Sequence, residues 1–286
     1  MTKSRGVLFV VNTMRDDAKQ VANELQGLLS AAGFVPYAYE DAEILDMAPV
    51  TTQALKEIEI AIVLGGDGTM LRGAEAIRET KIPLLGVNLG HVGFLAEVEK
   101  PTVTEIAQAV ISKSYISDKR MVLAYSVSRD GKEVDQGWAL NEVTIERNGT
   151  TMVQLFVQID HRPLSRWGCD GLICSTPTGS TAYAFSAGGP VVWPEVEALV
   201  LLPISAHALF ARPMVISPES QIVVDIESCD ALLSGDSIRK FSLKLGDRVT
   251  LTRDPGTVQL AHLRETLFSD RLVAKFKLPV EGWRGE

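Results

Sequence analysis

The stretch that most constrains the fold of this 286-residue chain is Gly65-Gly66-Asp67-Gly68-Thr69. An apolar run, residues 60–64, precedes it and a helix-like run, residues 70–78, follows it. A strand, a glycine loop and a helix together bind phosphate, because glycine lets the backbone turn sharply and a helix start offers free N–H groups. A carboxylate in such a loop repels phosphate unless it handles a proton or a metal ion. Asp67 therefore indicates chemistry, and the alternative is a tight turn in which it caps the helix.

Strand and helix patterns alternate around this loop. The pattern predicts strands at 6–12, 34–39, 59–64 and 82–88, and helices at 18–32, 51–57, 69–79 and from Thr102 or Thr104 to about 112. Asp16 or Asp17 is expected to cap the first helix. This alternation predicts a parallel sheet covered on both faces, with ligands at the carboxyl ends of the strands. The loop 65–69 and the segment 88–96, which contains Phe94, both fall at such ends.

The pattern changes near residue 118. Alternation begins at Met121, Asp130-Gly131 is a hairpin signal, and residues 133–145 are expected to form the partner strand. Further strands are predicted at 153–160, 171–176, 198–203, 214–217, 221–226, 240–245 and 247–252. The turn signals between them are residues 161–163, 217–219, 234–236 and 245–247. The second half is therefore predicted to be β-rich, with a final helix-like segment at 269–277.

Composition excludes several classes of protein. The net charge is −8, which argues against nucleic acid as a partner, and charged residues make up an ordinary 22%. No apolar run approaches the ~20 residues that span a bilayer, and the N-terminal run is too short for a signal peptide. Three cysteines without metal-ligand spacing fit a reducing compartment. We therefore expect a cytoplasmic protein with no membrane or nucleic-acid partner.

A second motif lies at residues 168–190, with Thr178-Gly179-Ser180-Thr181-Ala182-Tyr183 at its centre. The pair Asn141-Glu142 lies between it and the first glycine loop, as does the segment 86–96. In this order the motifs resemble the NAD kinase family, over most of the chain. The first loop alone also resembles those of diacylglycerol-type lipid kinases and phosphofructokinases.

The resemblance implies an α/β N-terminal domain with a Rossmann-like parallel sheet, followed by a β-rich C-terminal domain. We expect the first domain to cover residues 1–117 and the second to cover residues 118–265. A segment at residues 266–286 is expected to return to the first domain.

The same resemblance implies transfer of a phosphoryl group to the 2′-hydroxyl of the adenosine ribose of NAD, from ATP or inorganic polyphosphate. Asp67 matches the family's catalytic carboxylate, which takes the hydroxyl proton or orients the hydroxyl. The backbone of Gly68 is expected to approach the acceptor, and Arg72 is either a phosphate contact or a surface arginine. No side-chain motif for a metal is present, so Mg²⁺ is expected to arrive with the donor.

The remaining expected contacts are to NAD. Asn141 and Glu142 suit ribose hydroxyls and a purine edge, or else form an ordinary polar pair at a strand end. A further alternative for Glu142 is to help hold the metal ion through water. Phe94 is expected near a base, the alternative for its segment being a plain turn, and Asp170 near the nicotinamide end, often from a neighbouring subunit. The second motif contributes Thr178, Gly179, Ser180, Thr181, Ala182, Tyr183 and Ser186. A plain capped helix start is the alternative for this motif.

Two positions depart from the family pattern. Gly168 stands where some members have arginine, a role that Arg166 is expected to take, and Ile238 stands where some have a polar residue.

The resemblance implies a homodimer or homotetramer. The competing hypotheses are a lipid kinase sharing the glycine loop and a non-catalytic NAD(P) sensor, which would be expected to lack the acid at Asp67.

Overall fold

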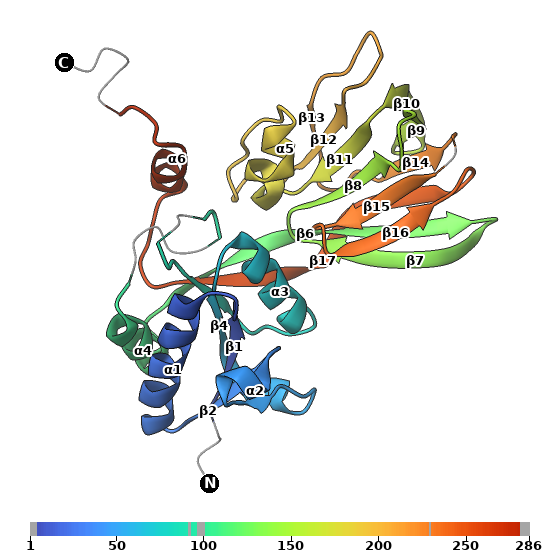
Figure 1. Cartoon of the computed structure of the whole chain (residues 1–286). Coiled ribbons are helices and arrows are strands. Elements are labelled where there is room, and N and C mark those ends of the chain that lie inside the picture. Colours follow the sequence, from blue (N-terminus) through green and yellow to red (C-terminus); the bar gives the residue numbers. More distant parts are fainter. Residues whose placement is uncertain (1–4, 91–92, 96–100, 229, 281–286) are drawn as a thin grey trace. The chain divides into compact units, whose positions relative to one another are not determined.

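A computed structural model of the chain describes residues 5–90, 93–95, 101–228 and 230–280. The chain divides into two compact units: residues 1–119 with 258–286 form unit 1, and residues 120–257 form unit 2. Two long strands, β6 (Ile116–Arg129) and β17 (Arg248–His262), carry the chain from one unit into the other (Figure 1).

Unit 1 contains a parallel sheet. Its strands, in the spatial order β5-β4-β1-β2-β3, are β5 (Leu84–Val87), β4 (Ile58–Leu64), β1 (Arg5–Val11), β2 (Phe34–Ala38) and β3 (Ala48–Pro49). The end of β17 lies parallel to β5, with Leu260 opposite Leu84. The central strands are almost continuously apolar because both of their faces are buried.

Helices cover both faces of this sheet. On one face, α1 (Asp16–Ala31) and α4 (Val103–Ser112) pack their apolar side chains with those of β1 and β4 in one core. On the other face lies α3 (Asp67–Ile77), where a Cβ on Gly73 would come within 2.8 Å of Val63 and Leu84. Two short helices, α2 (Ala42–Leu45) and η1 (Ala54–Lys56), complete the connections before β4.

The helix starts in unit 1 differ in how they are capped. Thr102 caps α4 in a capping box with Glu105, as predicted for one of the two candidate threonines. The prediction that Asp16 or Asp17 caps α1 is wrong, since both lie inside its first turn and the N-cap is Arg15. The Asp17 carboxylate instead binds the Arg15 guanidinium and accepts the N–H of Ala18.

Unit 2 is built from antiparallel strands in two sheets. The strands of the first, in spatial order, are β13 (Met214–Ile216), β12 (Leu199–Ile204), β11 (Gly171–Ser175), β8 (Glu142–Arg147), β15 (Ala231–Gly235) and β16 (Arg239–Leu243). The second contains β10 (Arg162–Cys169), β9 (Val153–Ile159), β14 (Ile222–Ile226) and the first part of β17, with β6 and β7 (Lys132–Ala139) alongside. Side chains from both sheets, among them the fully buried Trp167, form one core.

The predicted hairpin is confirmed, since β7 pairs with β6, but the continuous strand at 133–145 is wrong, because β7 and β8 are separate strands in different sheets. The break falls at Leu140-Asn141, whose backbone N–H groups donate to the Asp236 side chain instead of to a neighbouring strand. Two strands of unit 2, β10 and β15, were not predicted, and the turn signal at 234–236 lies partly within β15. The turn before β10 is made by Asp160 and His161, which have φ values of 50° and 62°.

The C-terminal segment belongs to unit 1. Its helix α6 (Phe268–Phe276) packs phenylalanine side chains on Phe94, which follows β5 in the chain. The predicted fold class is confirmed: an α/β unit with a returning C-terminal segment and a β-rich unit.

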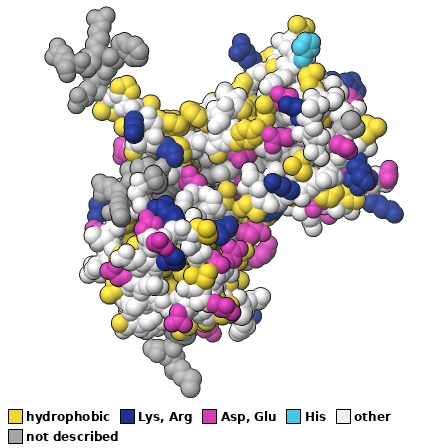
Figure 2. All heavy atoms as spheres, in the orientation of Figure 1, with side chains coloured by type: hydrophobic (Ala, Val, Ile, Leu, Met, Phe, Trp, Pro, Cys, Tyr) yellow, Lys and Arg dark blue, Asp and Glu magenta, His cyan; other side chains and the backbone are white. Residues whose placement is uncertain are grey.

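Across the described residues, no helix combines the length and apolar character needed to cross a membrane. On the face shown in Figure 2, lysine and arginine side chains are scattered among aspartate and glutamate side chains and do not form a single stripe.

Candidate functional site

Asp67 lies three residues beyond the carboxyl end of β4 and is the first residue of α3. Thr69 and Met70 donate their N–H groups to the Gly66 carbonyl at 2.9 and 3.0 Å, which closes the first turn of the helix. The positive end of the helix dipole stabilises the Asp67 carboxylate. Its Oδ1 atom is buried and has no hydrogen-bond partner among the described residues. Because such an atom is costly to bury unpaired, it favours a donor supplied by a ligand.

The other predicted residues of unit 1 lie in different environments. Gly68 is exposed and the space beside its Cα is open, so a ligand can approach its backbone. Arg72 forms an ion pair with Glu40 at 2.7 Å, and both side chains are partly exposed. This contact fits the alternative in which Arg72 is a surface arginine. Phe94 is buried, and its packing on α6 accounts for the ring without a ligand. His91, Val92 and Ala96 of the predicted segment lie outside the described residues.

In unit 2 the backbone around Asn141-Glu142 is held by a buried carboxylate. Asp236 accepts the N–H groups of Leu140 and Asn141 at 2.7 Å each, and that of Glu142 at 3.3 Å. Burial raises the pKa of Asp236, while the backbone donors and the Arg239 guanidinium, 3.5 Å away, act in the opposite direction. The buried carboxylate of Asp236 therefore fixes the backbone of the Asn141-Glu142 pair.

The two unit 2 motifs are bonded to each other. Thr176 donates its N–H to the Asn141 carbonyl at 2.8 Å and its hydroxyl to the Leu140 carbonyl at 2.6 Å. The same hydroxyl accepts the N–H of Gly179 at 3.2 Å. A Cβ on Gly179 would overlap the backbone of Asn141, so only glycine permits this approach. The structure thus brings the Asn-Glu pair and the Thr-Gly-Ser-Thr-Ala-Tyr motif together.

Glu142 is 6% exposed, and its Oε2 atom has no partner among the described residues. Burial raises the pKa of Glu142 to about 8, and the negative charges of Asp236 and Glu146 add to this, while a backbone hydrogen bond from Tyr183 lowers it. At neutral pH the carboxyl group is therefore mostly protonated and can donate a hydrogen bond as well as accept one.

Tyr183 is 37% exposed and donates its hydroxyl to Glu146 at 2.9 Å. Burial, followed by this hydrogen bond, raises the pKa of Tyr183 to about 12. Glu146 also accepts the Thr144 hydroxyl at 3.1 Å. Sequence reasoning did not identify Glu146, although the two-residue period of β8 places Glu142, Thr144 and Glu146 on one face of the sheet.

A helical turn begins directly after Pro177, as expected, but it is short. The segment forms two short turns, η2 (Thr178–Thr181) and α5 (Tyr183–Ser186). The N–H groups of Ser180 and Ala182 already donate to the carbonyls of Pro177 and Gly179. Thr178, Gly179 and Ser180 are buried, Thr181 and Ala182 are half-buried, and Tyr183 and Ser186 are exposed. Ligands therefore have more access to the later part of the motif.

Asp170 lies between β10 and β11 and pairs with Arg147 at 2.7 Å. Arg166, the residue suggested in place of the family's arginine, pairs with Glu227 at 3.1 Å and lies over the Phe156 ring. The cation beside Asp170 is Arg147, and sequence reasoning did not identify this arginine.

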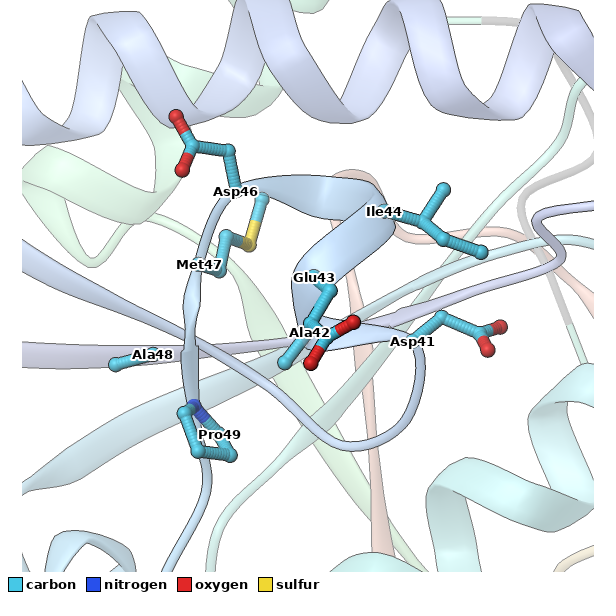
Figure 3. Close-up of a pocket in the computed structure, with 8 residues that line it drawn as sticks. All are labelled: Asp41, Ala42, Glu43, Ile44, Asp46, Met47, Ala48 and Pro49. Carbon is cyan, nitrogen blue, oxygen red and sulfur yellow. The ribbon is translucent and has the colours of Figure 1, made fainter.

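A pocket of 740 Å³ lies at α2, and none of the predicted site residues lines it (Figure 3). Figure 3 shows Asp41 and Asp46 at opposite ends of this short helix, with Glu43 on it. Asp41 is engaged by the Thr13 hydroxyl at 2.7 Å. Among the residues that the structure describes, no group of three or more acidic, histidine or cysteine side chains is arranged to hold a metal ion.

Comparison with known proteins agrees with this geometry. Residues 7–115 match the model of the ATP-NAD kinase N-terminal domain, and residues 140–263 match that of the ATP-NAD kinase C-terminal domain. The chain is 45% identical over 295 residues to NAD kinase 2 of Streptomyces avermitilis, covering 99% of this chain and 98% of that one. It is 44% identical over 307 residues to the NAD kinase of Mycobacterium bovis, covering 100% of both chains.

Two solved structures share the fold. The yeast NADH kinase complexed with NADH superimposes with a TM-score of 0.84 at 24% identity, covering 97% of this chain and 88% of that one. An NAD kinase from Archaeoglobus fulgidus in complex with ATP gives 0.73 at 24% identity, covering 96% and 100%. The family models and the curated relatives support neither the lipid-kinase nor the sensor hypothesis. The chain belongs to the ATP-NAD kinase family of phosphotransferases.

Proposed function

We propose that this chain transfers a phosphoryl group from ATP to the 2′-hydroxyl of the adenosine ribose of NAD, with Asp67 as the residue that takes the hydroxyl proton. The reaction class follows from the family, and the roles of the individual residues are our proposal. The observation that carries it is the buried Oδ1 atom of Asp67, which has no hydrogen-bond partner among the described residues. A ribose hydroxyl placed against it would supply the missing donor.

The transfer requires the donor's phosphate charge to be neutralised. Mg²⁺ bound with the phosphates supplies that neutralisation. The ion is proposed to arrive bound to the phosphates of the donor, as Mg²⁺ does in many phosphoryl-transfer sites. Inorganic polyphosphate presents the same chemistry and is a second candidate donor. Arg72 would contact a phosphate only after leaving Glu40.

We assign the recognition of NAD mainly to unit 2. The protonated Glu142 carboxyl offers a donor to a ribose oxygen or a base nitrogen, and Asn141 offers an amide. The exposed ring of Tyr183 offers a face to the acceptor, and Asp170, next to Arg147, is proposed to meet the nicotinamide end. Thr181 and Ser186 lie on the accessible part of the same motif.

A homodimer or homotetramer is proposed on the basis of the exposed apolar side chains in unit 2, which include Leu209, Phe210 and Val215. The edge strand β13 leaves backbone groups for pairing. Light scattering at working concentration should give at least twice the 31.1 kDa of one chain. A fully active monomer would contradict this proposal. We also propose that the protein is cytoplasmic.

The decisive experiment is Asp67→Asn, which keeps the side-chain shape and removes the base. We expect turnover at saturating NAD and ATP to fall by on the order of a hundredfold to ten-thousandfold, with NAD binding retained. Asp46→Asn, at an exposed position in the same unit, serves as the control. Partial recovery with excess Mg²⁺ would assign Asp67 to the metal ion, and near-normal turnover would reject it as the base.

A further inference from the structure

The backbone of Gly93 lies directly against the proposed base. A Cβ built on Gly93 would overlap Oδ1 of Asp67 and would lie 3.2 Å from its Cγ atom. This is the same oxygen that is buried without a partner among the described residues. The carboxylate therefore has one wall made of backbone, and any movement of residue 93 changes the room available to it.

The residue after Gly93 is Phe94, whose side chain packs on the C-terminal helix α6. Phe94 is buried, and its ring centroid lies 6.2 Å from that of Phe268 and 5.6 Å from that of Phe276. The two α6 phenylalanines are eight residues apart, which places them on one face of the helix two turns from each other. The Phe94 ring thus contacts side chains at both ends of α6.

Arg271 lies on α6 between these two rings and is 3% exposed. Its Nη1 atom donates to the Phe94 carbonyl at 3.5 Å, and its Nη2 atom lies 3.0 Å from Nδ1 of His262. The Nε2 atom of His262 lies 3.6 Å from Asp118. A guanidinium is costly to bury unless hydrogen bonds satisfy it, so this arrangement ties α6 to the carbonyl of Phe94, the residue that follows Gly93.

We propose that Arg271 is a positioning residue for phosphoryl transfer: with Phe268 and Phe276, it fixes Phe94 and so holds the Gly93 backbone against Asp67. The proposal rests on the proposed function, in which Asp67 is the base. A base must lie within hydrogen-bond reach of its proton, so a small shift of this backbone wall affects turnover more than acceptor binding. The C-terminal segment acts on the reaction through this contact.

The test is a double-mutant cycle with Asp67→Asn. Arg271→Lys and Phe276→Leu keep the charge or the apolar character while loosening the grip on Phe94. We expect each to lower kcat on the order of ten- to a hundredfold, with KM for NAD unchanged within about twofold. Gly93→Ala probes the last link directly and should lower kcat in the same way. Ser269→Ala, at an exposed position on α6, is the matched control and should leave kcat unchanged.

The background variant separates positioning from a general effect on the fold. If Arg271 acts through Asp67, Arg271→Lys in the Asp67→Asn background should lower kcat by less than about twofold further. Equal losses in both backgrounds, or full activity of folded Arg271→Lys and Phe276→Leu, would overturn the inference and leave Asp67 as the base. Near-normal turnover of Asp67→Asn alone would instead remove the proposed function, and this inference with it.

Discussion

The carboxylate of Asp236 accepts the backbone N–H of Asn141 at 2.7 Å, across 95 residues of sequence. The same carboxylate takes the N–H of Leu140, so the break between β7 and β8 is stabilised by a buried side chain and not by strand pairing. The orientation of the Asn-Glu pair therefore depends on a residue that need not touch a ligand.

The first prediction concerns this carboxylate. Asp236→Asn keeps the volume but replaces one acceptor oxygen with an amide donor, which leaves a buried backbone N–H without its partner. We expect a loss of about 1–3 kcal/mol in the free energy of unfolding, measured by urea titration. A higher KM for NAD should accompany it, because Asn141 and Glu142 lose their anchor.

Asp230→Asn provides the matched control, since Asp230 is exposed at the start of the hairpin that contains Asp236. Its unfolding free energy and KM for NAD should stay at wild-type values. An Asp236→Asn protein that is as stable as the wild type would show that the backbone around Asn141 does not depend on this side chain.

The second prediction concerns pH. Burial raises the pKa of Glu142 from its ordinary 4.5 to about 8 in the folded chain. The folded state therefore holds a proton that the unfolded state has released, and the stability this gives is complete below pH 4.5. It is lost between about pH 4.5 and pH 8, by at most about 1.4 kcal/mol per pH unit, and the loss levels off once the pH has passed through the folded pKa of about 8.

Glu142→Gln has no such proton and should not show this decline. The difference in melting temperature between Glu142→Gln and the wild type should therefore shift in favour of the variant as the pH is raised from 6 to about 9. Glu133→Gln, at an exposed position in the same unit, should follow the wild type at every pH. A pH-independent difference for Glu142→Gln would mean that Glu142 is ionised when folded.

The sequence predicts the parts of this structure that depend on local patterns. The strands β1, β2, β4 and β5 of unit 1 are found because each is rich in consecutive apolar residues, whereas the two-residue strand β3 is missed. Asp67 is found because its glycine loop is contiguous in the sequence. The strand β10 is missed because Arg162-Pro163 resembles a turn, and pairing with β9 decides its conformation. Tertiary context therefore overrides the local signal there.

The residues that sequence reasoning missed act across long separations. Glu146 reaches Tyr183 over 37 residues, and Arg271 reaches Phe94 over 177. No periodicity or turn chemistry encodes such contacts, since they exist only once the sheet and α6 are packed. Glu146 alone had a local signal, its position in phase with Glu142 on β8.

The third prediction separates the ring of Tyr183 from its hydroxyl. Tyr183→Ala removes the exposed face proposed to meet NAD, and a stacked base is worth about 1–3 kcal/mol, so the KM for NAD should rise roughly fivefold or more. Tyr183→Phe keeps the ring and loses only the bond to Glu146, so its KM should rise less. Phe185→Ala, at an exposed aromatic position in the same short helix, is the control. A change confined to the KM for ATP would assign the motif to the donor.

The last prediction concerns Asp170 and Arg147, which pair at 2.7 Å with side chains 38% and 35% exposed. A pair this exposed contributes only about 0–1 kcal/mol to stability, so neither Asp170→Ala nor Arg147→Ala should change the melting temperature by more than a few degrees. If Asp170 contacts NAD, Asp170→Ala should raise the KM for NAD well beyond the small effect of losing the ion pair.

Arg147→Ala discriminates between the two roles of Asp170. It removes the same ion pair but leaves the carboxylate available to the nicotinamide end of NAD, where a cationic ring would be attracted to it more strongly once the competing guanidinium is gone. We therefore expect the KM for NAD to rise in Asp170→Ala and to stay level or fall in Arg147→Ala, as measured by steady-state kinetics with saturating ATP. Equal rises in the two variants would mean that the pair, and not the Asp170 carboxylate, supports acceptor binding.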